Sequence, residues 1–178
     1  MTVSMPMPPR PPRRALLGLG AALAAASLLL TAGCGFHLRA PEALPYARLA
    51  LSGFGNRSTM ADEIRRALPP ETRITKDVRE AQVVIESLED TRDTTVEAST
   101  SIGQVRELKL HVKLRFRVLR PDGHELLKAT EIERERDLSY NESNALAKDT
   151  ELNALYQDMQ SDIAVQLMRM LAALGRAG

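Results

Sequence analysis

The chain has 178 residues, of which 44% are hydrophobic and 26% charged, so it is typical of a globular protein with room for one domain of ordinary size. Its 24 basic and 23 acidic residues nearly balance, which argues against a nucleic-acid-binding protein, and its single cysteine excludes an internal disulfide and a cysteine-based zinc site. The charge is uneven: residues 1–33 hold three arginines and no acid, whereas the remaining 145 residues (178 − 33) hold 21 basic and 23 acidic side chains.

Residues 1–33 are predicted to be an export signal. Met1–Arg14 is basic and rich in proline, and Ala15–Leu30 then runs without a charge, over fewer than the ~20 residues that a spanning helix needs. Thr31-Ala32-Gly33 and Cys34 follow, a pattern similar to the bacterial lipobox, although Thr31 stands where leucine is usual. We therefore expect acylation of Cys34, with two or more chains giving stable anchoring. The alternative is a plain signal peptide with an unmodified cysteine.

The residues after the cysteine indicate where the protein resides. Gly35 stands where some lipoproteins carry an aspartate that retains them at the inner membrane, so we expect the outer membrane, with the protein facing the periplasm. Residues 34–45 contain Pro41 and Pro45 and are expected to form an extended tether. A folded domain is predicted over residues 46–178.

Short elements open this domain. Ala47–Ser52 alternates weakly and is predicted to be a strand, and Ser58 or Thr59 is expected to cap a helix that ends near Leu68, before two prolines. Thr72–Thr75 is a candidate short strand. Val83–Leu88 is a β-rich run that is expected to extend toward Val96.

The clearest pattern is strict alternation along residues 107–118. Even-numbered positions from Leu108 to Val118 are apolar and the odd-numbered positions between them are polar, which predicts a long strand with one dry face. Arg120–Gly123 reads Arg-Pro-Asp-Gly, a type I turn sequence, so the chain is expected to return as a second long strand over Glu125–Leu138.

A three-residue loop with Gly123 as its bulge, which sets Arg120 opposite His124, predicts the register of this hairpin. The predicted opposed pairs are Lys113 with Glu131, His111 with Glu133, Lys109 with Glu135, Val118 with Leu126, and Val112 with Ile132. In this register Arg115 and Arg117 face Ala129 and Leu127. These two arginines are therefore candidate contacts for an anion or a partner protein.

A long helix is predicted to end the chain. Apolar residues spaced by three and four predict it from about Asn144 to Leu174, with Gly175 as its cap. The helix would be about 46 Å long, close to the length of the hairpin. Together these elements predict an α+β domain: a mostly antiparallel sheet of about four strands with a long hairpin, covered by two helices of which the C-terminal one is long.

The sequence carries no recognisable catalytic motif. His124 and Glu125 open a string similar to a zinc-protease motif, but Lys128 stands where the second histidine is needed. No phosphate-binding loop or serine nucleophile motif occurs in the domain, and the one thiol is expected to be acylated. We therefore expect a protein that is not an enzyme and that has no cofactor and no metal site.

The residues from Cys34 onward resemble a known family. Cys34–Arg39 reads Cys-Gly-Phe-His-Leu-Arg, similar to the start of mature LptE, the lipopolysaccharide-assembly lipoprotein family of Gram-negative outer membranes. The resemblance continues through Gly103-Gln104, the Pro-Asp-Gly turn and Ala145–Lys148 into the last helix, while Ala40 departs from it. It implies two helices on a mostly antiparallel sheet.

The resemblance also implies a function and partners. LptE proteins plug the large outer-membrane barrel LptD and help it assemble, and the pair inserts lipopolysaccharide into the outer leaflet. A lipopolysaccharide-contacting basic residue of the family matches Lys148, for which a plain solvated lysine is the alternative. A second lies in the loop that here reads Ser99–Ile102 without a basic residue, so Arg106 is the candidate substitute.

A different class remains as the alternative: a solitary periplasm-facing lipoprotein that binds a ligand in an apolar cavity. A barrel lumen is polar, so a plug needs a polar outer surface instead. Strict alternation, with only one dry face for the helices to cover, favours the plug.

Overall fold

A computed structural model of the chain describes residues 43–140 and 145–177. The predicted signal, Cys34 and most of the predicted tether lie outside these residues, so the predicted boundaries at 33 and 45 stay predictions. None of the helices in the described part combines the length and apolar character needed to cross a membrane.

Five strands form one sheet, in the order β2-β1-β3-β4-β5. The elements in chain order are β1 (Arg48–Ser52), α2 (Thr59–Ala67), β2 (Arg73–Ile74), a 3₁₀ helix η2 (Val78–Glu80), β3 (Val83–Ser99), β4 (Val105–Leu119), β5 (Glu125–Ser139) and α3 (Ala145–Ala177). Strand β1 runs parallel to β2 and β3, whereas β3, β4 and β5 are antiparallel neighbours. The predicted α+β class is confirmed; the fifth strand is the two-residue β2.

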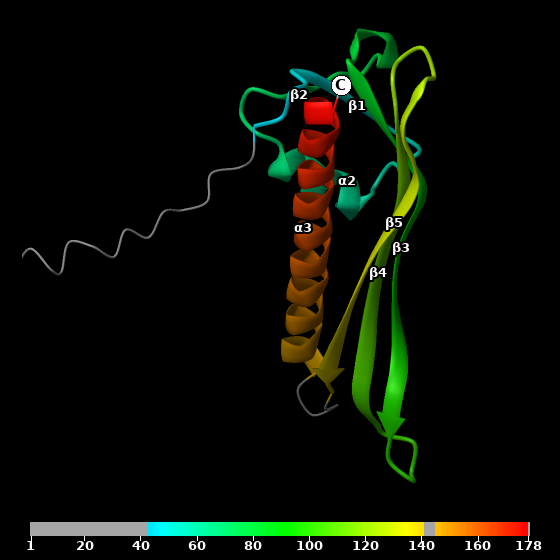
Figure 1. Cartoon of the computed structure of the whole chain (residues 1–178). Coiled ribbons are helices and arrows are strands. Elements are labelled where there is room, and N and C mark those ends of the chain that lie inside the picture. Colours follow the sequence, from blue (N-terminus) through cyan, green and yellow to red (C-terminus); the bar gives the residue numbers. More distant parts are fainter. Residues whose placement is uncertain (1–42, 141–144, 178) are drawn as a thin grey trace, which may run out of the picture. The chain divides into compact units, whose positions relative to one another are not determined.

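Both helices lie on one face of the sheet, which we call the covered face (Figure 1). Helix α3 contacts β4, β5 and α2, and the Gln160 side chain of α3 donates a 2.7 Å hydrogen bond to the Thr59 hydroxyl of α2. Large buried side chains of α3 recur at helical spacing, among them Tyr156, Met159, Ile163, Leu167 and Leu171. The predicted apolar stripe of this helix is therefore confirmed.

The predicted long strand is also confirmed. The even-numbered residues of β4 from Leu108 to Val118 point into the core, and five of them have 0% exposure: Leu110, Val112, Leu114, Phe116 and Val118. Upstream, Ser58 caps α2, because its hydroxyl accepts a hydrogen bond from the Ala61 backbone. The helix that was predicted to end near Leu68 ends at Ala67.

The hairpin turn forms as predicted, but the register beyond it does not. The Arg120 backbone donates to His124 over 2.8 Å, and Gly123 has a φ of 88°, as a bulge glycine requires. Two bulges in β5 then shift the pairing by one residue each, so the register moves by two residues in total. Because side chains alternate with period two, this two-residue shift keeps the β5 side chains from Thr130 onward on their predicted face, whereas Leu127, between the two bulges, changes face and lies opposite Val118.

The shift changes all five predicted pairs. The observed opposed residues are Lys113 with Glu133, His111 with Glu135, Lys109 with Asp137, Val118 with Leu127, and Val112 with Arg134. The predicted helix cap is also wrong: Gly175 lies inside α3, which continues to Ala177.

Candidate functional site

The basic candidate residues lie in two separate places. Lys148 lies in the first turn of α3, and Arg106 is the second residue of β4. Arg115 and Arg117 lie further along β4, on the face opposite to the helices. The structure therefore does not bring the four side chains together into one site.

Lys148 has an ion-pair partner. Its Nζ lies 2.7 Å from Oε2 of Glu151, one turn further along α3, and its side chain is 22% exposed. Helix N-termini favour negative charge, and Glu151 offsets the unfavourable effect of a lysine at this end. The lysine is still accessible enough to exchange this partner for another anion.

Arg106 lies at the base of the β3–β4 loop. Its Nη2 lies 3.3 Å from Oε1 of Gln104, and its carbonyl accepts a 2.8 Å hydrogen bond from the Tyr140 backbone. The β3–β4 pairing is irregular here, with a register shift around this residue. The loop itself is closed by a 2.8 Å bond from the Thr100 backbone to Gln104, and the Ile102 side chain at its tip is 79% exposed. Figure 1 shows this loop extending past the first turn of α3.

The expectation that Arg115 and Arg117 face no acid is wrong. Arg117 pairs through Nε with Glu86 of β3 and through Nη1 with Glu125 of β5, the latter over 3.9 Å. Arg115 lies opposite Glu89 on one side and Glu131 on the other. The bulges in β5 and the acids of β3 supply these neighbours, and sequence reasoning had considered neither.

The face that carries these arginines, which we call the charged face, is a basic strand between two acidic strands. Its basic residues lie at odd-numbered positions of β4 from 109 to 117: Lys109, Lys113, Arg115 and Arg117, with His111 among them. Its acids are Glu86, Glu89, Asp93 and Glu97 on β3, and Glu125, Glu131, Glu133, Glu135 and Asp137 on β5. Acids outnumber bases, so the face is negative overall.

Ion pairs with β3 set the protonation of this basic strand. The hydrogen bond that Lys109 donates to Glu97 raises the pKa of Lys109, and Asp137 and Glu135 add to the effect through their charge. Glu89 raises the pKa of Lys113 in the same way, and Glu86 raises the pKa of Arg117. These three side chains are therefore firmly cationic at neutral pH.

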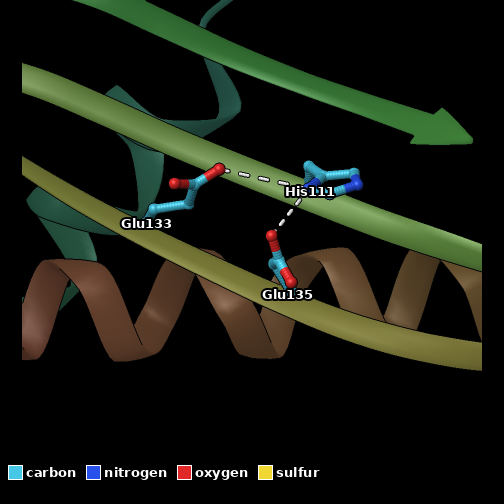
Figure 2. Close-up of side chains that lie close together, drawn as sticks. All are labelled: His111, Glu133 and Glu135. Carbon is cyan, nitrogen blue, oxygen red and sulfur yellow. Dashed lines mark ion pairs between the residues drawn. The ribbon is translucent and has the colours of Figure 1, made fainter.

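His111 differs from its basic neighbours because it faces the acids of β5. Its Nδ1 lies 3.3 Å from Oε1 of Glu135 and 4.0 Å from Oε1 of Glu133. Figure 2 shows the two carboxylates converging on the imidazole ring, on the side of the sheet away from α3. The three ligand atoms lie within 4.8 Å of one another, close enough to hold a cation. The sequence contained these residues, but the predicted register paired His111 with Glu133 alone.

Comparison with known proteins places the chain in a family. The family model LptE, described as lipopolysaccharide-assembly, matches residues 46–171. The LPS-assembly lipoprotein LptE of Photorhabdus laumondii is 27% identical over 154 residues, which are 85% of this chain and 84% of that protein. The LPS-assembly lipoprotein LptE of Yersinia pestis (strain Pestoides F) is 28% identical over 159 residues, 85% of this chain and 74% of that protein.

Solved structures share the fold. The solution structure of lipoprotein B from Nitrosomonas europaea has a TM-score of 0.66 and 27% identity, and covers 81% of this chain and 94% of that one. The crystal structure of the rare lipoprotein B from Shewanella oneidensis has a TM-score of 0.58 at 22% identity, covering 71% and 94%, and so supports the fold alone. From the match across residues 46–171, the chain belongs to the LptE lipopolysaccharide-assembly family.

Proposed function

We propose that this protein is a non-enzymatic lipopolysaccharide-assembly lipoprotein that plugs an LptD-like outer-membrane barrel. In this proposal acyl chains on Cys34 hold it on the outer membrane, facing the periplasm, after residues 1–33 are removed, and residues 34–45 link the lipid to the domain. It helps the barrel assemble and takes part in inserting lipopolysaccharide into the outer leaflet. The observation that carries the proposal is the family match over residues 46–171.

The charged face supports the role of a plug. The lumen of a large outer-membrane barrel is polar, so a protein that fills it needs a surface that stays hydrated or pairs with polar side chains. The charged face offers rows of both signs, and its central lysines lie only about a third exposed or less, at 28% for Lys109 and 30% for Lys113. Such ordered rows of charge are suited to selecting one orientation inside a polar lumen.

The filled core argues against the solitary ligand-binding lipoprotein. A carrier of lipid needs an enclosed apolar cavity, and such sites are lined mainly by hydrophobic side chains. Here the space between the sheet and α3 is occupied by large side chains with 0% exposure, among them Phe116, Met159 and Leu167. A hollow of about 620 Å³ on the charged face is open and is bordered by polar residues such as Thr91 and Asp93.

Lys148 and Arg106 are the proposed contacts to lipopolysaccharide. Phosphate groups are the natural ligands of lysine and arginine, and arginine binds them with two parallel hydrogen bonds. Strand β5 ends at Ser139 and α3 starts at Ala145, while the Tyr140 backbone bonds to Arg106. Both basic residues therefore lie toward the same end of the domain, although their side chains have separate partners.

Co-purification from outer membranes tests the proposed function. The lipidated chain, extracted in mild detergent, is expected to carry with it a large β-barrel whose migration on a denaturing gel changes on heating. A folded chain that repeatedly purifies alone, or with a tightly bound lipid and no barrel, would favour the solitary ligand-binding lipoprotein instead.

A further inference from the structure

We propose that His111, Glu133 and Glu135 form a binding site for a divalent transition-metal ion of the zinc class, on the charged face of the sheet. Glu133 and Glu135 are two residues apart on β5 and therefore project from the same face. His111 lies on the neighbouring strand, directly opposite Glu135. Two ligands from one strand and a third from the next strand can surround one ion from three sides.

The distances fit an ion with little rearrangement. Zinc binds nitrogen and carboxylate oxygen at about 2.0–2.2 Å, so two ligands in tetrahedral geometry lie roughly 3.4 Å apart. The His111 Nδ1 lies 3.3 Å from one carboxylate oxygen and 4.0 Å from the other, and all three ligand atoms lie within 4.8 Å of one another. Small rotations of two exposed glutamate side chains would complete the triangle.

The carboxylates of this cluster are not taken by the neighbouring lysines. Lys109 and Lys113 flank His111 on β4, yet each pairs with β3: Lys109 with Glu97 over 3.1 Å and Lys113 with Glu89 over 2.6 Å. The arginines of β5 are also directed elsewhere: Arg134 donates to Gln166 of α3, and Arg136 lies 3.8 Å from Asp162 of α3. The nearest cations thus make their closest ion pairs outside the cluster, although Lys109 and Lys113 still interact with Glu135 and Glu133 through their charge.

The other nitrogen of His111 has a partner as well. Its Nε2 lies 3.4 Å from the Thr95 hydroxyl on β3. Metal-binding histidines commonly donate their second ring N–H to such an acceptor, which fixes the tautomer and leaves the first nitrogen for the metal. The open hollow beside His111 and Glu133 has room for a water as the fourth ligand.

The set of ligands indicates the class of ion. Magnesium and calcium prefer ligand sets made only of oxygen, whereas one imidazole with two carboxylates suits zinc and its first-row neighbours. A bound ion would also offset part of the surplus negative charge on this face and would join β4 to β5, which is the edge strand of the sheet. The inference does not depend on the proposed function.

Calorimetric titration of the purified full chain with zinc chloride, in detergent and free of chelators, tests the site. We expect one ion per chain and an increase in melting temperature on saturation. His111→Gln and Glu135→Gln are each expected to weaken binding at least tenfold, since loss of even an outer-shell partner commonly costs about 10–100-fold. Both variants must match the melting temperature of the parent chain without metal; Glu133→Gln is the replacement if one does not.

Three matched controls make the result specific. Glu131→Gln removes a carboxylate from the same face of β5, and His124→Gln and His37→Gln remove the other two histidines of the chain. All three are expected to bind zinc as the parent chain does. The proposal is overturned if the parent chain does not bind zinc at millimolar concentration, if His111→Gln binds unchanged, or if equimolar magnesium displaces the zinc.

Discussion

Gly175, in the last turn of α3, lies directly against Pro45, just before β1. A β-carbon placed on Gly175 would stand 1.8 Å from Cγ and 2.7 Å from Cβ of Pro45, far inside van der Waals contact. The backbone of Gly175 is not in the left-handed region, so its role is to allow close approach and not to end the helix. Pro45, the last residue of the predicted tether, therefore contacts the last turn of the C-terminal helix.

Gly175→Ala is expected to destabilise the domain by about 1–2 kcal/mol, since forcing an extra carbon into a filled space usually costs this much. The sign of the change in unfolding free energy is informative, because a glycine-to-alanine change at an unconstrained helical position stabilises a protein by about 0.5–1 kcal/mol. Urea denaturation followed by circular dichroism measures the difference. In a double variant, Pro45→Gly removes the ring that obstructs the new β-carbon. Adding Gly175→Ala to Pro45→Gly should therefore lower the free energy of unfolding only slightly. A Gly175→Ala variant that is more stable than the parent chain would contradict the close contact between Gly175 and Pro45.

Local patterns predicted the long elements of this fold well. The alternation of β4 and the Arg-Pro-Asp-Gly turn depend on neighbouring residues, and both are confirmed. The register of the hairpin could not be settled from charge, because acids recur at every second position of β5 from Glu131 to Asp137. A slip of two residues therefore keeps bases opposite acids, and no sequence signal marked the two bulges that produce it.

The partners of the basic strand were harder to predict than the strand itself. Glu86, Glu89 and Glu97 of β3 are not evenly spaced, because bulges interrupt the alternation of that strand. Their pairing with β4 is set by a second hairpin, formed by β3 and β4, whose register these bulges shift, so the alternation of β4 alone did not reveal it. For a similar reason the cluster of His111, Glu133 and Glu135 emerged only from the structure, because the pairing of His111 shifts by two residues to place it opposite Glu135.

Leu114→Asp is expected to abolish both folding and capture of the barrel, even with the lipid attached. Leu114 has 0% exposure and lies between Asp90 and Ile132 in the register, so the new carboxylate would have no cation directly opposite it. Burying an unpaired charge costs several kcal/mol, comparable to the whole stability of a domain, which is about 5–15 kcal/mol. Val112 is a weaker choice because it lies between Arg92 and Arg134.

Ala129→Asp is the matched control for this change, since it adds the same charge at an exposed position of β5. Circular dichroism and co-purification should show a folded, barrel-bound protein for the control and neither property for Leu114→Asp. A folded Leu114→Asp chain would mean that the core tolerates a charge there.

Lys148→Glu is expected to weaken lipopolysaccharide binding by the unlipidated chain without lowering its melting temperature. The lost ion pair with Glu151 is exposed and contributes only about 0.2–1 kcal/mol, while an acid in the first turn gains from the helix dipole. Affinity should be measured at two salt concentrations, because the Debye length of about 8 Å at physiological salt screens exposed charges.

Lys76→Glu, at an exposed position between β2 and η2, is the control for a general charge effect. If both basic residues contact the same lipid, Arg106→Ala should also lower the affinity for lipopolysaccharide, by less than Lys148→Glu does. Unchanged affinity in Lys148→Glu removes this residue from the proposed contact, whatever the behaviour of the barrel complex.

Cys34→Ala, exported with an ordinary cleavable signal, is expected to be soluble in the periplasm and still to co-purify with a co-expressed barrel. A domain of this size can bury a standard protein interface of about 1,600 Å² or more inside a lumen, enough to hold the complex without lipid. The acyl chains would then mainly raise the effective concentration of the protein near the assembling barrel. Fractionation shows the loss of membrane attachment, and affinity capture shows the complex. If the unlipidated chain has the circular dichroism spectrum and melting temperature of the parent yet never captures a barrel, the plug proposal fails, and the solitary ligand-binding lipoprotein becomes the better account.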